Sequence, residues 1–147
     1  MRNTGKPSER RFENALRKLY GVRVHIQEFY DAAYLHGLNG KPVKAPDQPA
    51  DRLVTLNGQM FYAEIKSVSK GQSFPFNIIK PNQLSAAVLA TKAGGTYLFM
   101  VHDLQTDTFY KVPASLVLST KEAGKQSLKW NQMEVWEDYE AYKKGTS

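Results

Sequence analysis

The sequence predicts an α/β fold in which a mixed central β-sheet is flanked by helices. Three observations lead to this prediction: a helical stripe of apolar residues near the start, a hairpin signal at Asn57-Gly58, and a helical segment over 81–93 that precedes the apolar run of 96–102. Helical spacing of apolar residues is typical of amphipathic helices, and short β-branched or aromatic runs are typical of strands. Helices interspersed with strands favour a sheet covered by helices.

The N-terminal elements are predicted first. A helix begins near Pro7 and ends at Gly21, because its apolar residues form one stripe: Phe12, Ala15, Leu16, Leu19 and Tyr20. Residues 22–30 are rich in β-branched and aromatic types and predict a strand. Residues 31–50 contain five glycines and prolines, and we interpret them as a long connection or arm.

The remaining elements follow the hairpin. Asn-Gly is the preferred pair for a type I′ turn, so strands are expected on both sides of Asn57-Gly58. The further expectations are a loop over 67–80, a helix over 81–93, a buried strand over 96–102, a strand over 108–112 and a helical turn over 114–119. A polar segment over 121–133 follows, and then an uncertain C-terminal tail over 134–147 with a short helix over 134–144.

Composition and charge limit the classes of function. The chain of 147 residues contains no cysteine, which excludes disulfides, zinc-cysteine sites and thiol catalysis and favours a reducing compartment such as the cytoplasm. No apolar run approaches the roughly 18 residues of a membrane helix. The net charge is +6, of which residues 1–23 carry +5, and residues 1–6 form a basic arm. This basic end favours a polyanionic partner, nucleic acid first.

Three ionisable residues gather on the predicted hairpin. With a two-residue turn at Asn57-Gly58, Asp51 lies opposite Glu64, and Lys66 projects from the same face. Two opposed carboxylates can share a hard divalent cation such as Mg²⁺, and the lysine can orient a water or neutralise a phosphate. The alternative is a surface hairpin on which Lys66 merely offsets two exposed acids.

These residues resemble a known signature. Pro49-Ala50-Asp51, with Glu64-Ile65-Lys66 thirteen positions beyond Asp51, resembles the PD-(D/E)XK nuclease motif. Gly5 with Glu9 resembles the G-x-x-x-E opening of Holliday-junction resolvases of the archaeal and RecU types, and Gln83 lies where those families carry a glutamine. The resemblance covers residues 5 to about 101 and leaves the last 45 residues unmatched.

The resemblance implies one nuclease domain over 1–147 with a restriction-endonuclease-like fold. It implies Mg²⁺, replaceable by Mn²⁺, on Asp51, Glu64 and the Ile65 carbonyl, with Glu9 directly or through water. Lys66 would position the attacking water, and Gln83 would hold the site or the DNA backbone. The implied protein is a cytoplasmic homodimer, in a bacterial, archaeal or phage-infected cell, that cuts four-way DNA junctions without an organic cofactor. The expected phosphate contacts are Arg2, Lys6, Arg10, Arg11 and Lys70.

Several alternatives stay open from the sequence. Glu13 lies one helical turn after Glu9 and could take its role. The chain could be another PD-(D/E)XK nuclease of the repair, restriction or phage type, or a non-catalytic basic module that binds nucleic acid. Ser8 carries no triad signal, and Phe74 and Phe76 could stack on exposed bases, although core packing is favoured.

Overall fold

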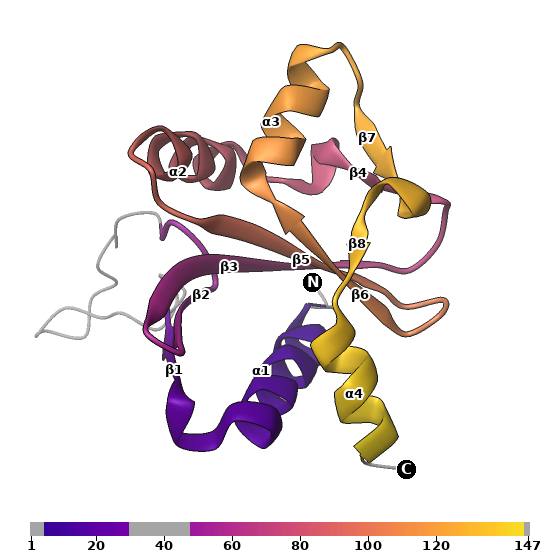
Figure 1. Ribbon diagram of the computed structural model, residues 1–147. Helices are drawn as coiled ribbons and strands as arrows, with labels where there is room; N and C mark the ends of the chain where they lie inside the picture. Colours follow the sequence, from indigo (N-terminus) through magenta and orange to yellow (C-terminus); the bar gives the residue numbers. More distant parts are fainter. Residues whose placement is uncertain (1–4, 30–47, 146–147) are drawn as a thin grey trace, which may run out of the picture.

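A six-stranded mixed sheet forms the centre of the molecule in a computed structural model that describes residues 5–29 and 48–145 (Figure 1). β3 and β5 are parallel, and the other neighbouring pairs are antiparallel. In spatial order the strands are β1 (Val24–Glu28), β2 (Arg52–Leu56), β3 (Gln59–Val68), β5 (Tyr97–Asp103), β6 (Thr108–Pro113) and β8 (Glu134–Val135).

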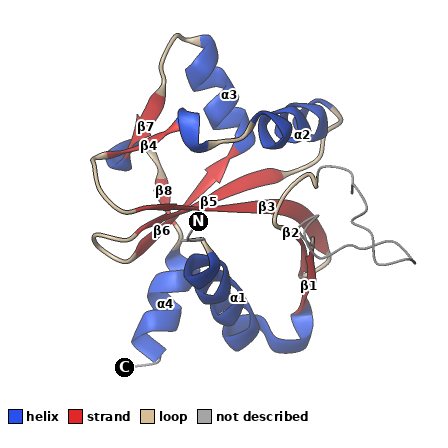
Figure 2. Ribbon diagram, turned by 180° about the vertical axis from the view of Figure 1, so that it is seen from behind, coloured by secondary structure: helices blue, strands red, loops and turns tan. Residues whose placement is uncertain are grey.

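Helices cover both faces of this sheet. Figures 1 and 2 show α1 (Lys6–Tyr20) and α4 (Glu137–Gly145) on one face, with α2 (Pro81–Lys92) and α3 (Ala114–Glu122) on the other. A two-stranded sheet of β4 (Ser73–Pro75) and β7 (Ser127–Lys129) lies beside α3. This arrangement confirms the predicted fold class and divides the interior into two layers, one on each side of the sheet.

Each layer has its own hydrophobic core, because the side chains of a strand alternate between the two faces. The core under α1 and α4 includes the fully buried residues Phe12, Leu16, Met100, Phe109 and Tyr139. The core under α2 and α3 includes Phe74, Phe99, Val101, Val112 and Val117. Every residue of β5 is buried, as the apolar run predicted.

The hairpin has the predicted register. Leu56 pairs with Gln59 and Leu53 with Tyr62, so the turn between β2 and β3 has two residues. Asn57 has φ 50° and Gly58 has φ 83°, the left-handed values that a type I′ turn requires at both central positions. The residue before β2 therefore lies beside Glu64.

Several sequence-based boundaries were wrong. Residues 21–23 form a 3₁₀ turn, so β1 begins at Val24, and the helix over 114–119 extends to Glu122. The expected loop over 67–80 holds the end of β3 and all of β4, and the polar segment over 121–133 holds β7. β4 and β7 are far apart in the sequence and stabilise each other by pairing, with Phe74 opposite Leu128. The local sequence therefore could not indicate either strand.

The segment expected to be an uncertain tail is part of the fold as far as Gly145. The helix expected over 134–144 begins only at Glu137, because Glu134 and Val135 pair with β6 as strand β8. The rings of Trp136 and Phe12 lie 5.2 Å apart, and the Tyr20 hydroxyl donates to Asp138 at 2.7 Å. Of the expected basic arm over 1–6 and the connection over 31–50, only residues 5–6 and 48–50 lie within the described residues. No helix in the described parts of the chain is long and apolar enough to cross a membrane.

Candidate functional site

Asp51 and Glu64 hold each other in place at the start of β2. The main-chain N–H of Asp51 donates to Glu64 Oε1 at 3.0 Å, and the N–H of Ile65 donates to Asp51 Oδ2 at 2.9 Å. Glu64 is only 2% exposed, whereas Asp51 is half-buried. The pairing predicted from the hairpin turn is therefore confirmed, and the two carboxylates lie side by side within the fold rather than on an open surface.

Gln83, in the first turn of α2, links Glu64 to Lys66. Its Nε2 donates to Glu64 Oε2 at 2.8 Å, and its Oε1 accepts from Lys66 Nζ at 2.7 Å. Lys66 Nζ also lies 3.4 Å from Glu64 Oε2. Four residues that the sequence singled out thus form one connected polar cluster; they come from the residue before β2, from β3 and from α2.

Tyr97 fixes the segment that leads into Asp51, and sequence reasoning missed it. Its hydroxyl donates to the Pro49 carbonyl at 2.6 Å, and its ring is buried against Tyr62 and Phe99. The tyrosine lies in an apolar run that predicted only core packing. A buried tyrosine usually finds a partner for its hydroxyl, and that is the one signal the sequence offered.

Burial and the adjacent Asp51 carboxylate raise the pKa of Glu64 to about 8, although Lys66 opposes the shift. When the Glu64 carboxylate is ionised, its negative charge is not fully balanced by nearby positive charge. A divalent cation between Asp51 and Glu64 would relieve the repulsion between them. Carboxylate and carbonyl oxygens are the ligands that Mg²⁺ prefers. Within the described residues Asp51 Oδ1 has no hydrogen-bond partner, so the donor set fits a hard cation.

Glu9 approaches from the other face of the sheet. Its Oε1 lies 3.0 Å from an Arg52 guanidinium nitrogen, and burial and then the Asp51 charge raise its pKa. Glu13, the alternative to Glu9, accepts from Arg52 Nε at 2.7 Å and pairs with Arg17. No three acidic, histidine or cysteine side chains of the described residues form a metal-binding group, so Glu9 lies beside the Asp51–Glu64 pair rather than within it.

Arg52 is a second residue that sequence reasoning missed. It is 4% exposed and lies between the acids of α1 and the main chain of Asp51. The signal was present: Glu9 and Glu13 are four residues apart on the apolar side of a helix, and buried acids require a cation.

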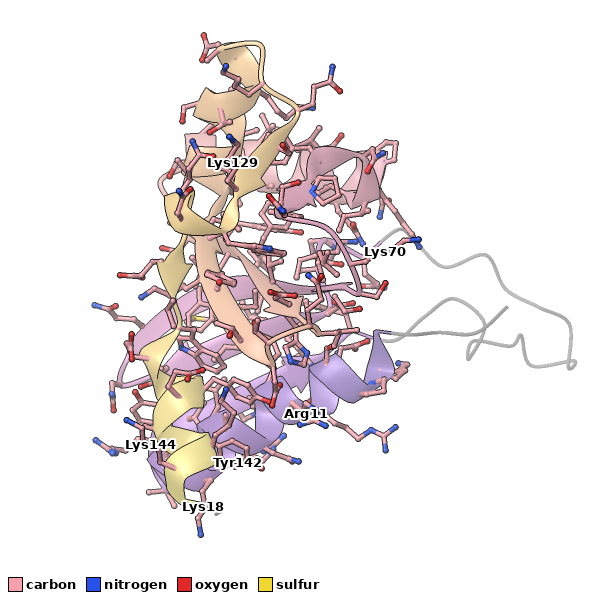
Figure 3. The ribbon with its side chains drawn as sticks, turned by 90° about the vertical axis from the view of Figure 1, so that its right-hand side faces the viewer. Arg11, Lys18, Lys70, Lys129, Tyr142 and Lys144 are labelled. Atoms are coloured by element: carbon pink, nitrogen blue, oxygen red, sulfur yellow. The ribbon has the colours of Figure 1, made fainter. Side chains whose placement is uncertain are left out.

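The expected phosphate contacts lie in different settings. Arg10 and Lys70 are exposed, Lys70 in the loop after β3 as Figure 3 shows, and Lys6 begins α1. Arg11 turns toward α4, where it lies 3.4 Å from the Tyr139 hydroxyl and 3.9 Å from Asp107 (Figure 3). Arg2 lies outside the described residues.

A hydrogen-bonded serine, histidine and aspartate lie apart from this cluster. Ser8 Oγ is 2.7 Å from His102 Nδ1, and His102 Nε2 is 2.7 Å from Asp107 Oδ1, a contact for which the sequence carries no signal. Ser8 and His102 are each 1% exposed. A substrate cannot reach a nucleophile buried in this way, and the three residues instead tie α1 to the turn after β5.

Phe74 and Phe76 do not stack on nucleic acid. They are 0% and 5% exposed, and their rings pack against each other with centroids 5.8 Å apart in the core under α2 and α3. The base-stacking alternative was therefore wrong for both residues, and the core-packing alternative is confirmed.

No protein-family model and no curated protein matches this sequence. Solved structures do match its fold, among them Hjc of Archaeoglobus fulgidus, a Holliday junction resolvase from an archaeal hyperthermophile. The match has a TM-score of 0.53 and covers 90% of this chain and 98% of that chain. The two proteins share a fold. Because the sequences are only 10% identical, the likeness to Hjc concerns the fold alone.

Proposed function

We propose that this chain is a metal-dependent DNA endonuclease that cuts branched DNA, with the four-way junction as its substrate. The observation that carries the proposal is the reciprocal pair of Asp51 and Glu64, joined through Gln83 to Lys66. The pair occurs on a fold shared with a Holliday junction resolvase. The basic N-terminal segment, with a net charge of +5 over residues 1–23, supplies the charge that a DNA backbone requires.

The metal ligands would be Asp51, Glu64 and the Ile65 carbonyl, with Glu9 at the edge of the site. When bound, Mg²⁺ or Mn²⁺ would polarise a phosphodiester oxygen and favour ionisation of a nearby water. The Lys66 ammonium, held by the Gln83 and Glu64 oxygens, would hold that water in line with the phosphorus and stabilise the negative charge that develops there. Hydrolysis adds one water across one phosphodiester bond and needs no organic cofactor.

The DNA backbone would be held by exposed cations beside the cluster. Lys6 and Arg10 on α1 and Lys70 after β3 would contact phosphates, together with Arg2, and Arg11 would join them after leaving Asp107. A four-way junction has two equivalent strands to cut. Two copies of the chain, related by a two-fold axis, would cut both in the same geometry.

The test compares a synthetic four-way junction with a linear duplex of the same sequence, in Mg²⁺ or in EDTA. We expect the wild-type chain to nick the junction symmetrically only in Mg²⁺. Asp51→Asn and Lys66→Ala should each lower the rate by at least a hundredfold without loss of junction binding. Lys92→Ala, at the end of α2, is the matched control and should cut like the wild type.

Each contrary result has a distinct meaning. Equal cutting of duplex and junction would make the chain another PD-(D/E)XK nuclease and remove the junction selectivity. Binding without metal-dependent cutting would overturn the nuclease proposal and leave a basic module that binds nucleic acid.

A further inference from the structure

One buried guanidinium, that of Arg52, lies against carboxylates from two different elements. Its nitrogens lie 3.0 Å from Glu9 and 2.7 Å from Glu13 on α1, and 3.6 Å from Glu28 at the end of β1. The Arg52 side chain is only 5% exposed. Arg17 also pairs with Glu13 on the exposed side of α1, but Arg52 is the cation that all three acids share. Without its guanidinium they would repel one another across the gap between α1 and the sheet.

The same guanidinium also holds the main chain of Asp51. A terminal nitrogen of Arg52 donates to the Asp51 carbonyl at 2.9 Å, and the N–H of Phe29 donates to that carbonyl at 3.0 Å. The N–H of Asp51 donates to Glu64 on the other side. Both ends of the Asp51 residue are thereby fixed: its N–H is held by Glu64, and its carbonyl is held by Arg52 and by Phe29, the residue after β1.

This arrangement needs the planar guanidinium of an arginine, whose three nitrogens form a fork of N–H donors. Arg52 contacts Glu9 and the Asp51 carbonyl through one terminal nitrogen, Glu13 through Nε, and Glu28 through the other terminal nitrogen. A lysine ammonium carries the same charge but is a single point, and it cannot reach acceptors that are spread over the plane of a guanidinium. Charge and geometry can therefore be separated by substitution at this one position.

We propose that Arg52 is a positioning residue of the carboxylate site and acts through Glu9 and the main chain of Asp51. Strand β2 begins with Arg52 directly after Asp51, so any movement of the guanidinium moves the backbone that carries the first carboxylate. The contact with Glu9 fixes α1 against the same point. This inference rests on the proposed function, because it assigns the residue that gives the proposed metal ligands their relative positions.

The test measures Mn²⁺ binding to the full chain by electron paramagnetic resonance at 10 °C, with the folded fraction checked by circular dichroism. Arg52→Lys keeps the charge and removes the fork, so we expect it to bind Mn²⁺ at least tenfold more weakly than the wild type. Arg17→Gln is the control, because Arg17 also pairs with Glu13 but on the exposed side of α1, and its affinity should stay within twofold.

Arg52→Gln is a second variant that separates loss of charge from loss of positioning. It also replaces Arg52→Lys in the test if that variant does not fold. The loss of a positive charge near two carboxylates would by itself tighten Mn²⁺ binding, whereas the loss of positioning weakens it, so the two explanations predict opposite signs. Binding as tight as that of the wild type, or tighter, in either folded variant overturns the role of Arg52 and leaves the proposed function intact. A wild-type chain that binds no Mn²⁺ overturns the metal site and both proposals together.

Discussion

Glu64 is the residue at which folding and the proposed chemistry conflict most directly. Its carboxylate is buried between Asp51 and Lys66, and three hydrogen-bonding groups fix its position. Burial and the Asp51 charge raise its pKa from an ordinary value of 4.5 to about 8. The fold therefore maintains a carboxylate pair whose mutual repulsion opposes folding in the absence of a cation.

The raised pKa of Glu64 predicts how stability depends on pH. Between pH 4.5 and about 8 the folded chain keeps the Glu64 proton and the unfolded chain loses it. The folded state then binds more protons, so the Glu64 contribution to the free energy of unfolding falls as pH rises through this window. Urea unfolding in EDTA at a series of pH values checks this expectation. Glu64→Gln should show a smaller fall than the wild type, and identical pH profiles would contradict the shift.

Asp51→Asn tests the same repulsion from the other carboxylate. Asparagine can still accept the hydrogen bond from the Ile65 N–H, but it carries no charge. We expect the melting temperature in EDTA to rise by about 2–4 °C, which corresponds to about 1 kcal/mol for a chain of this size. Glu122→Gln, at the end of α3, should leave the melting temperature unchanged. A lower melting temperature for Asp51→Asn would show that its charge stabilises the fold.

Among the elements, α4 and the residues that lead into it complete the core under α1. Trp136 is 7% exposed and packs its ring against Phe12 and Phe109. Tyr139 is fully buried, and its hydroxyl donates to Asp107 at 2.7 Å. Since α1 carries Glu9, the C-terminal helix supports the site without contacting it.

Trp136→Ala should therefore lower the free energy of unfolding by about 3–5 kcal/mol, the usual loss for a large aromatic removed from a core. Trp130→Ala is the comparison, because Trp130 is only half-buried where it stacks on Tyr110, and its loss should cost less. Urea unfolding followed by circular dichroism measures both. Equal losses would indicate that α4 is not an integral part of the core.

The elements that sequence could predict are those whose determinants are local. The type I′ turn depends on Asn57 and Gly58 alone, and its register brings Asp51 beside Glu64. The strands β4 and β7 depend on each other across the chain and have no local signal. Arg52 was missed for a related reason: the acids of α1 indicate that a cation is needed, but the partners of Arg52 come from α1 and β1, and only the folded chain shows which cation meets them.

For the whole molecule, the charge distribution predicts a salt-dependent affinity for DNA. The chain carries +6 overall, and each phosphate contact that a lysine or arginine makes releases counterions. Lys70→Ala should reduce the slope of log K against log salt by about one and weaken binding to junction and duplex alike. Mn²⁺ affinity should not change. Filter binding at several salt concentrations gives the slope, with Lys144→Ala at the end of α4 as the control. An unchanged slope for Lys70→Ala would show that Lys70 does not contact the DNA backbone.

The two separate cores have a consequence for how activity emerges during folding. Gln83 reaches Glu64 and Lys66 from the layer of α2 and α3, whereas Glu9 and Arg52 belong to the layer of α1 and α4. A chain in which only one layer has formed lacks half of the polar contacts at the carboxylate pair. Partly folded molecules would thus lack a complete carboxylate cluster, so the activity proposed for this chain would arise only after both layers have formed.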